Sequence, residues 1–294
     1  MNRSSSPSPE SGPQTQTLLQ IRDLAVSYGR GKSERVDALS DVSLEICAQE
    51  TMGLVGESGS GKTTLGRALL GLVRPTAGEV LFEGRSVTAR SAARRWRGRL
   101  QVVLQNPDWS LNPSLKVWRS VSEPLTVRGG GGNRQSRRTA VATMLEMVGL
   151  DPSFGDRRPH ELSGGQRQRV AIARAIITDP SMIVFDEAVT ALDASVQTHV
   201  LNLIKDLQRE RGFAALFISH DLAAVRYVSH RICVVYKGKV VEIAPVARFY
   251  GHPEHPYSQH LLDSLPTARI RNPDGLAQLD NGRPGPHSSV DGNC

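Results

Sequence analysis

Cysteine is scarce in this chain of 294 residues, which contains only Cys47, Cys233 and Cys294. No two of them lie close together in the sequence, and this spacing argues against a disulfide framework and against a cysteine-based zinc or iron–sulfur site. The scarcity of cysteine fits a reducing compartment.

Long apolar runs are also missing. No stretch approaches the ~18 consecutive apolar residues that a membrane-spanning helix needs. The first 17 residues are rich in Ser, Pro and Gln and contain no apolar segment, so they do not resemble a secretory signal. We therefore expect a cytosolic protein, whatever it docks onto.

Lysine is rare among the basic residues: only six of the 36 are lysines, and the formal net charge is +7. A basic balance can indicate nucleic acid, an anionic membrane or an anionic ligand as partner. The arginines are scattered but are dense over residues 85–99, where Trp96 is the only aromatic residue. A solvated surface segment explains this density better than a nucleic-acid patch, and we expect no nucleic-acid partner.

A glycine-rich loop is what the chain does contain. Residues 56–64, GESGSGKTT, fit the phosphate-binding pattern G-x-x-x-x-G-K-[ST]. They follow an apolar run at 51–55 that predicts a buried strand, and they lead into a helical pattern at 64–70. Glycines let backbone N–H groups turn toward a phosphate, and a helix that begins at about Gly61 directs its positive end there. A flexible Gly/Ser turn is the alternative, and the strand–loop–helix context argues against it.

The pattern also assigns chemistry to side chains of the loop. Lys62 is expected to reach the β- and γ-phosphates, and the Thr63 hydroxyl is expected to ligate Mg²⁺. The loop therefore predicts binding of a nucleoside triphosphate, with Mg²⁺, but not the use of its energy. The predicted binding residues are Gly56, Ser58, Gly59, Gly61, Lys62, Thr63 and Thr64.

Two acids and a histidine follow later apolar runs. Residues 181–187 predict a buried strand that neighbours the P-loop and ends in Asp186 and Glu187. Asp186 is placed there to hold Mg²⁺ through water, and Glu187 to act as general base on the attacking water. His220, at the end of the run 213–218, can hydrogen-bond a γ-phosphate. Solvated carboxylates and a structural histidine are the alternatives, but the upstream loop needs such partners.

The rest of the pattern predicts a mixed α/β protein. Residues 117–177 are mainly helical around a glycine-rich break at 128–133, which indicates a helical insertion into an α/β core. Within it, Ser163 and the glycines after it form a helix start that can face a phosphate or can be an ordinary capped end. Other predicted elements are strands at 18–27, 42–46, 79–84 and 100–104, a helix at 193–211, and a hairpin of 232–236 with 239–243.

With LSGGQ at residues 162–166 added, the chain resembles the nucleotide-binding subunit of an ABC transporter over residues 18–266. The resemblance implies a P-loop NTPase core with an antiparallel β subdomain and an inserted α-helical subdomain at about 106–178. This ABC ATPase domain would span 17–266, between a disordered N-terminus at 1–16 and a flexible tail at 267–294.

The family's motifs find matches in order, and their roles are implied by that match. ATP would lie between the P-loop of one subunit and the signature segment of a second, head-to-tail subunit. The implied catalytic residues are Glu187, His220 and Gln105, and the implied Mg²⁺ ligands are Thr63, Gln105 and Asp186. Outside the P-loop, the implied ATP contacts are Tyr28 on the adenine, Ser163, Gly165 and Gln166 of the signature, and Asp193 of the D-loop.

Two segments resemble those of oligopeptide, dipeptide and nickel importers: QNPDWSLNP at 105–113 and HPYSQHLL at 255–262. The resemblance implies an energy-coupling ATPase at the cytoplasmic face of the cell membrane. Its partners would be two transmembrane permease subunits, a second ATPase subunit of the same or another kind, and indirectly a solute-binding protein. Residues 105–113 would be the docking surface for a permease. The chain departs from the family at 188–190, AVT, where many relatives have Pro-Thr-Ser.

Two other functions stay open at this point. One is an accessory ABC ATPase of a phosphonate-degrading complex, whose subunits resemble this subfamily. The other is a non-transport, nucleic-acid-linked ABC ATPase, although such proteins tend to carry two cassettes or a long coiled coil. A metal site at His252, His255 and His260 is a further hypothesis. The absence of an accompanying acid or cysteine cluster argues against it, as do the nearby prolines, which break a helical spacing.

Overall fold

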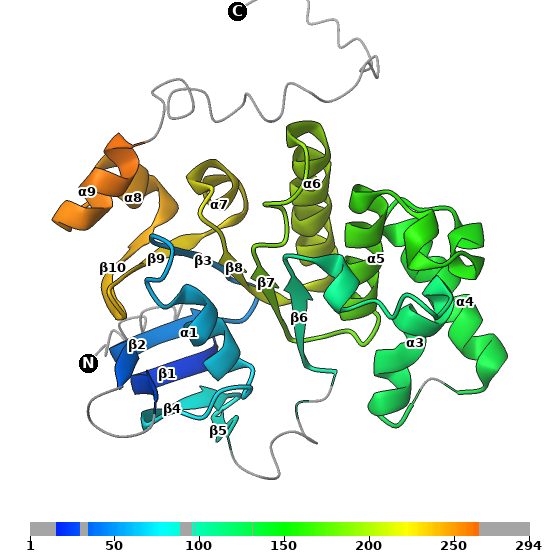
Figure 1. The fold of residues 1–294 in the computed structure, drawn as a ribbon, viewed down its shortest axis with the longest axis horizontal. Coiled ribbons are helices and arrows are strands. Elements are labelled where there is room, and N and C mark those ends of the chain that lie inside the picture. Colours follow the sequence, from blue (N-terminus) through cyan, green and yellow to red (C-terminus); the bar gives the residue numbers. More distant parts are fainter. Residues whose placement is uncertain (1–15, 30–34, 89–95, 97, 131, 265–294) are drawn as a thin grey trace, which may run out of the picture.

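The computed structural model describes residues 16–29, 35–88, 96, 98–130 and 132–264. Two sheets pack against a shared core, and a helical region extends from one edge of the larger sheet (Figure 1). The predictions for residues 1–15 and for the tail at 267–294 fall outside the described residues, as does most of the arginine-dense segment 85–99.

A six-stranded sheet forms the centre of the molecule. All neighbouring strands in it pair in parallel, except the last two along the chain, which form the predicted hairpin. Its order is β10 (Lys239–Pro245), β9 (Arg231–Tyr236), β3 (Thr51–Val55), β8 (Ala214–Ile218), β7 (Met182–Asp186) and β6 (Leu100–Leu104).

The strand that ends in the two acids, β7, is not the direct neighbour of β3, the strand before the loop. The strand β8 lies between β3 and β7 and pairs with both. An apolar run shows that a strand is buried but carries no information about which strand lies beside it. The acids still reach the loop's edge of the sheet, because the strands are parallel.

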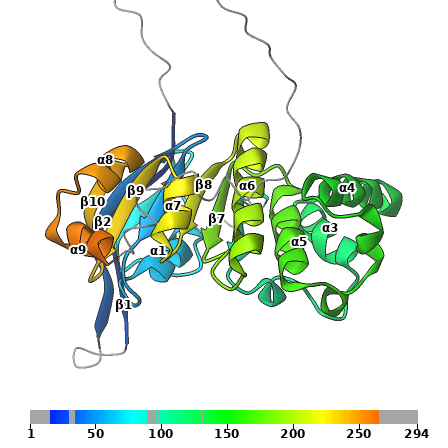
Figure 2. The same ribbon diagram turned by 90° about the horizontal axis from the view of Figure 1, so that it is seen from above.

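Both faces of this sheet are covered, which explains the continuous apolar runs. In β7, Ile183 and Phe185 join one hydrophobic core, whereas Met182 and Val184 join the other. The first core is shared with helices α5 (Gly164–Ile176), α6 (Ala194–Arg211) and α7 (Leu222–Val228). The second is shared with α1 (Lys62–Leu69) and the antiparallel sheet (Figure 2).

The smaller sheet is antiparallel, with the order β2 (Val36–Cys47), β1 (Thr17–Tyr28), β4 (Ala77–Phe82) and β5 (Arg85–Ser86). It confirms the predicted strand at 18–27. The second strand begins six residues before the predicted start at Val42, because its first residues are mostly exposed and show no apolar alternation. Phe82 meets Trp96 edge to face, with ring centroids 4.9 Å apart.

The helical pattern at 117–177 is confirmed as a region of separate helices. They are α3 (Val117–Val127), α4 (Arg134–Met147), the 3-10 turns η2 (Pro152–Asp156) and η3 (Pro159–Glu161), and α5. The predicted break lies between α3 and α4, and Asn133 ends it by accepting a hydrogen bond from the Ser136 N–H at 2.9 Å. A further turn, η1 (Pro107–Trp109), connects β6 to this region.

Three short helices were not predicted: α7, α8 (Val246–Gly251) and α9 (Pro256–Asp263). Pro256 does not break a helix but begins one, because the first helical residue needs no hydrogen-bonded N–H. His255 caps it, with Nδ1 accepting from the Tyr257 N–H at 3.1 Å. Among the described residues, no helix is long and apolar enough to cross a membrane.

Candidate functional site

Glycine is required at two points of the loop between β3 and α1. Gly56 has φ of 149° and Gly61 has φ of 110°, which side-chain-bearing residues rarely adopt. A Cβ at Gly56 would lie 2.1 Å from the Val235 carbonyl oxygen, and one at Gly61 would lie 2.7 Å from that of Ala38. The loop is therefore a fixed cradle packed against β9 and β2, not a flexible turn.

Lys62 begins α1 and is almost buried, with 6% of its surface exposed. Its Nζ donates hydrogen bonds to the carbonyl oxygens of Gly56 and Glu57, both at 2.7 Å. Burial lowers the pKa of Lys62, and the nearby carboxylates of Glu187 and Asp186 oppose that shift. A cation held in this way at the mouth of a glycine cradle fits a polyphosphate anion.

Several other residues of the loop are accessible, although Ser60 is buried. Ser58 and Gly59 form its exposed tip, Thr63 is exposed in the first turn of α1, and Thr64 is half-buried. A Cβ at Gly59 would meet no described atom within 4 Å, so this glycine borders open space. The Thr63 hydroxyl is therefore free to turn toward a ligand in front of the loop.

The acids of β7 lie at the same edge as the loop. Asp186 pairs with Ile218 of β8, and Ile218 pairs with Leu54 just before the loop. The helix α1 packs closely above them, since a Cβ at Gly66 would lie 2.9 Å from Ile218 Cδ1. Burial raises the pKa of Asp186, and the neighbouring Glu187 carboxylate raises it further.

The structure brings Glu187 and His220 together. The Glu187 N–H donates to the Ile218 carbonyl oxygen at 2.9 Å, and its φ of 50° lies in the left-handed region. This strained turn directs the carboxylate toward His220, whose Nδ1 lies 3.6 Å from Glu187 Oε1. His220 is 59% exposed, so the pair borders solvent at the open edge of the sheet.

Gln105 follows the strand beside Asp186, and Tyr28 lies in the strand pair that contacts the loop. Leu104 pairs with Asp186 across β6 and β7, so the exposed Gln105 follows directly beyond it. Tyr28 ends β1 and is 43% exposed. Its strand partner β2 contacts the loop, because the Ala38 carbonyl oxygen faces Gly61.

The signature residues are not part of this cluster. Ser163 Oγ accepts from the Gln166 N–H at 3.3 Å, and the Ser163 N–H donates to Gln166 Oε1 at 2.9 Å. Packing explains why residue 165 is a glycine, since a Cβ there would lie 2.6 Å from Val196 Cγ1 on α6. Helices α1 and α5 stand apart in both views (Figures 1 and 2). Asp193, the exposed N-cap of α6, also lies at an open surface.

Tyr257 is a contributor to the loop that sequence reasoning missed. Its hydroxyl accepts a hydrogen bond from the Glu57 N–H at 2.8 Å, across 200 residues of sequence. Its ring packs on that of Tyr236, with centroids 4.1 Å apart. The HPY sequence marked this segment, but nothing in the sequence indicates a contact with the loop. Among the described residues, no group of three His, Cys, Asp or Glu residues is arranged to hold a metal ion.

A glycine cradle before a helix, with carboxylates at the ends of parallel strands, defines a P-loop nucleotide-binding protein with two added subdomains. The sequence matches the family "ABC transporter" over residues 39–190. The chain belongs to the ABC transporter family and is an ATPase coupled to transport. The predicted fold class is confirmed.

Relatives and solved structures agree with this assignment. A Brucella abortus protein, provisionally named peptide import ATP-binding protein, is 46% identical over 269 residues, covering 89% of this chain and 80% of that protein. The oligopeptide transport ATP-binding protein of Bacillus subtilis is 44% identical over 255 residues, covering 86% and 83%.

Two solved structures share the fold. A dimeric ATP-binding cassette bound to ADP and phosphate has a TM-score of 0.71 at 30% identity, covering 78% of this chain and 99% of that one. A Clostridium perfringens component of an ABC transporter complex has a TM-score of 0.72 at 25% identity, covering 81% and 92%. None of these comparisons supports the phosphonate-degrading or nucleic-acid-linked alternatives.

Proposed function

We propose that this chain hydrolyses ATP to drive an importer of oligopeptides, dipeptides or a similar small solute. The names of the relatives support the solute class. The observation that carries the hydrolytic part is the pairing of Glu187 with His220 at the sheet edge that also bears the P-loop. A base, its orienting partner and a phosphate cradle then occupy one open surface.

In this proposal the described side chains divide the work on ATP. Lys62 and the loop amides hold the phosphates, and Tyr28 stacks on the adenine. Thr63, Asp186 and Gln105 would hold Mg²⁺, which neutralises phosphate charge when bound. Glu187 accepts the proton of the attacking water, and His220 fixes the Glu187 carboxylate and contacts the γ-phosphate.

The second half of the site would come from another ATPase subunit. The capping box engages the N–H groups of Ser163 and Gln166, and the N–H groups of Gly164 and Gly165 at the start of α5 stay available for an outside phosphate. Ser163, Gly165 and Gln166 would meet the γ-phosphate on the partner's P-loop, and Asp193 would lie at the same interface. A head-to-tail pair of two such surfaces closes on itself with two ATP molecules inside.

The membrane partners in this proposal are two permease subunits, to which a solute-binding protein delivers the solute. The docking surface is residues 105–113, where Trp109 is 74% exposed. An exposed tryptophan on a protruding turn is the kind of side chain that anchors protein interfaces. The chain would then lie peripherally at the cytoplasmic face of the membrane.

The substitution Glu187→Gln tests the hydrolytic role. It keeps the shape of the side chain but removes the base, so turnover should fall by about 10²–10⁴-fold. ATP should then hold two subunits together as a dimer, which size-exclusion chromatography with light scattering detects. Glu210→Gln, on the exposed face of α6, is the matched control. Normal turnover in Glu187→Gln would remove Glu187 from the mechanism.

A further inference from the structure

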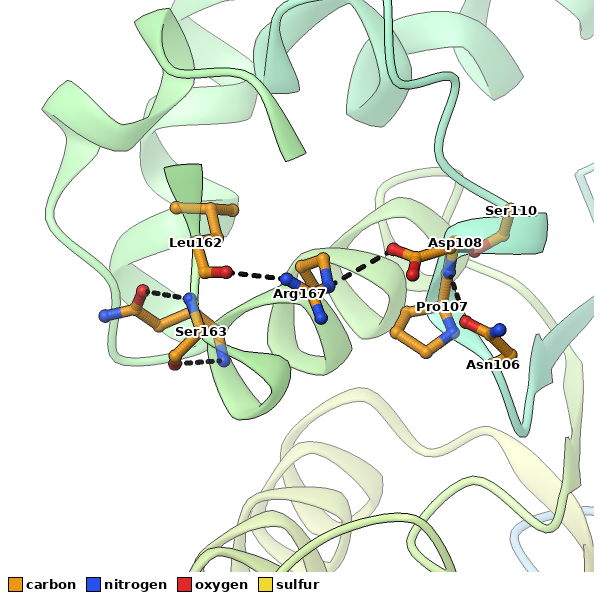
Figure 3. A network of polar contacts seen from close by, with 8 residues as sticks. Asn106, Pro107, Asp108, Ser110, Leu162, Ser163 and Arg167 are labelled. Atoms are coloured by element: carbon orange, nitrogen blue, oxygen red, sulfur yellow. Dashed lines mark hydrogen bonds and ion pairs between the residues drawn. The ribbon is translucent and has the colours of Figure 1, made fainter. Parts of the chain in front are cut away.

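One polar contact joins the start of the signature helix to the turn after Gln105 (Figure 3). Arg167 donates from Nη1 to the Leu162 carbonyl oxygen at 2.7 Å, and its Nε lies 3.1 Å from Asp108 Oδ1. Arg167 belongs to α5, whereas Asp108 is the middle residue of η1. In the part of the chain that the structure describes, no other hydrogen bond or ion pair joins residues 105–113 to residues 162–170.

A hollow separates the two segments on one side of this contact. The pocket of about 420 Å³ has Pro107 and Trp109 on one wall and Gly164 and Gln168 on the other. Apolar packing therefore does not fill the space between η1 and the beginning of α5. The ion pair bridges the two elements beside this hollow.

Both ends of the bridge are rigidly held. Asn106 caps η1 by accepting from the Asp108 N–H at 2.9 Å, and Ser110 Oγ donates to the Pro107 carbonyl oxygen at 2.8 Å. Arg167 lies one turn into α5, and its side chain donates back to the carbonyl oxygen of Leu162, the residue before the N-cap. A displacement of α5 can therefore reach η1 through this contact.

The geometry points to Arg167 as a positioning residue that transmits movement of the signature segment to the permease-docking turn. This inference rests on the proposed function, in which the partner's γ-phosphate meets the start of α5 and residues 105–113 meet a permease. When the dimer closes on ATP, the start of α5 moves. Arg167 transmits this movement to Asp108, and the solvent exposure of the neighbouring Trp109 changes.

The contact is also adjustable. The buried Nε of Arg167 lies close to Asp108, yet its N–H is not aligned for a hydrogen bond with any described residue. A small rotation of α5 therefore alters the strength of the contact, because hydrogen bonds depend steeply on angle. The pair is partly solvent-exposed, so its importance lies in position and not in stability.

Tryptophan fluorescence offers a direct test in the full chain carrying Glu187→Gln. Trp109 is 74% exposed, whereas Trp96 and Trp118 are each 7% exposed, so acrylamide quenching reports mainly on Trp109. ATP should change the quenching constant of the dimer, and Trp109→Phe should remove that change. Adding Arg167→Met should reduce the ATP-dependent change at least ~2-fold, and the exchange of Asp108→Arg with Arg167→Asp should restore it.

Arg174→Met is the matched control, because Arg174 is another α5 arginine paired with a carboxylate, Glu123, at 3.0 Å and with similar exposure. Its ATP-dependent change should equal that of the parent. The inference is overturned if Arg167→Met keeps the full change, if the charge exchange fails to restore it, or if Arg174→Met loses it equally. If the parent forms no ATP-dependent dimer, the proposed function fails first, and light scattering distinguishes that outcome.

Discussion

At the scale of single residues, burial in the site disfavours the charged forms of Asp186 and Lys62. Burial raises the pKa of Asp186, and the Glu187 carboxylate adds to that shift. Burial also lowers the pKa of Lys62, despite the acids around it. Shifts of this kind cluster at functional sites, where a ligand later supplies the missing charge. In the proposed function, Mg²⁺ supplies it for Asp186 and the phosphates supply it for Lys62.

The substitution Asp186→Asn should therefore stabilise the nucleotide-free protein while abolishing ATP turnover. Because the pKa of Asp186 is raised on folding, its contribution to stability is present at low pH and is lost as pH rises through the raised value. The variant's advantage should thus be absent in acid and should grow toward neutral pH. At neutral pH we expect the Tm of Asp186→Asn to exceed that of the wild type by about 2–4 °C. This is the shift that a stabilisation of ~1 kcal/mol produces in a protein of this size.

Thermal unfolding at a series of pH values measures this advantage. Asp206→Asn is the control, since Asp206 lies in an exposed ion pair with Arg209 at 2.8 Å. A Tm for Asp186→Asn below that of the wild type at neutral pH would contradict the electrostatic account of Asp186.

At the scale of elements, the sequence predicted where strands lie along the chain better than it predicted which strands lie side by side in the sheet. The strands at 51–55 and 100–104 were predicted to the residue, because polar or glycine residues bound each apolar run. Strand order was not predictable, because apolar runs do not show that β8 lies between β3 and β7. The helices α7, α8 and α9 were missed because each spans only six to eight residues, too few to show an apolar period.

The same limit applies to the candidate site. The P-loop, Asp186, Glu187 and His220 could be located from strand–loop patterns, since each stands where an apolar run ends. The approach of Tyr257 to the loop could not, because it depends on tertiary structure over 200 residues. Nor could the pairing of Arg167 with Asp108, since neither residue belongs to a pattern that names a partner.

The helix α9 supports the P-loop through one hydroxyl group. Tyr257→Phe removes the acceptor of the Glu57 N–H and leaves the ring packing on Tyr236 in place. The loss of about 1 kcal/mol expected for one hydrogen bond should weaken ATP binding ~5-fold, as measured by calorimetric titration. Tyr250→Phe is the control, because the Tyr250 hydroxyl donates to the Leu222 carbonyl oxygen, away from the loop. Equal losses in both variants would mean that general destabilisation is the cause.

At the scale of the whole molecule, the two surfaces proposed to face phosphates belong to different parts of the protein. The P-loop lies at the edge of the central sheet, whereas the start of α5 lies in the helical region (Figure 1). One chain therefore does not close a site on itself, and a single subunit should bind ATP but hydrolyse it poorly.

Gly164→Asp tests this separation. A Cβ at Gly164 would meet no described atom within 4 Å, and an acid suits the first turn of a helix, so the chain should fold. The new charge faces the position proposed for the partner's phosphate. We expect ATP binding by the monomer to stay within ~2-fold, and ATP-driven dimer formation by the Glu187→Gln protein to weaken ~10-fold or more.

The neutral Gly164→Asn is the matched variant, and it should weaken the dimer far less. Calorimetry on the monomer and light scattering on the dimer give the two affinities. An equal loss of both in Gly164→Asp would show that the signature segment acts on the nucleotide of its own chain.

The contact between Glu57 and Tyr257 joins residues that are synthesised at widely separated times. A ribosome adds roughly 5–20 residues per second, so the P-loop leaves it roughly 10–40 s before the tyrosine that supports it. During that interval β3, which is buried along its whole length, also lacks β8 and β9 on either side. The nascent chain carries an unprotected apolar strand until its C-terminal third arrives, and this is the stretch that a chaperone would have to shield.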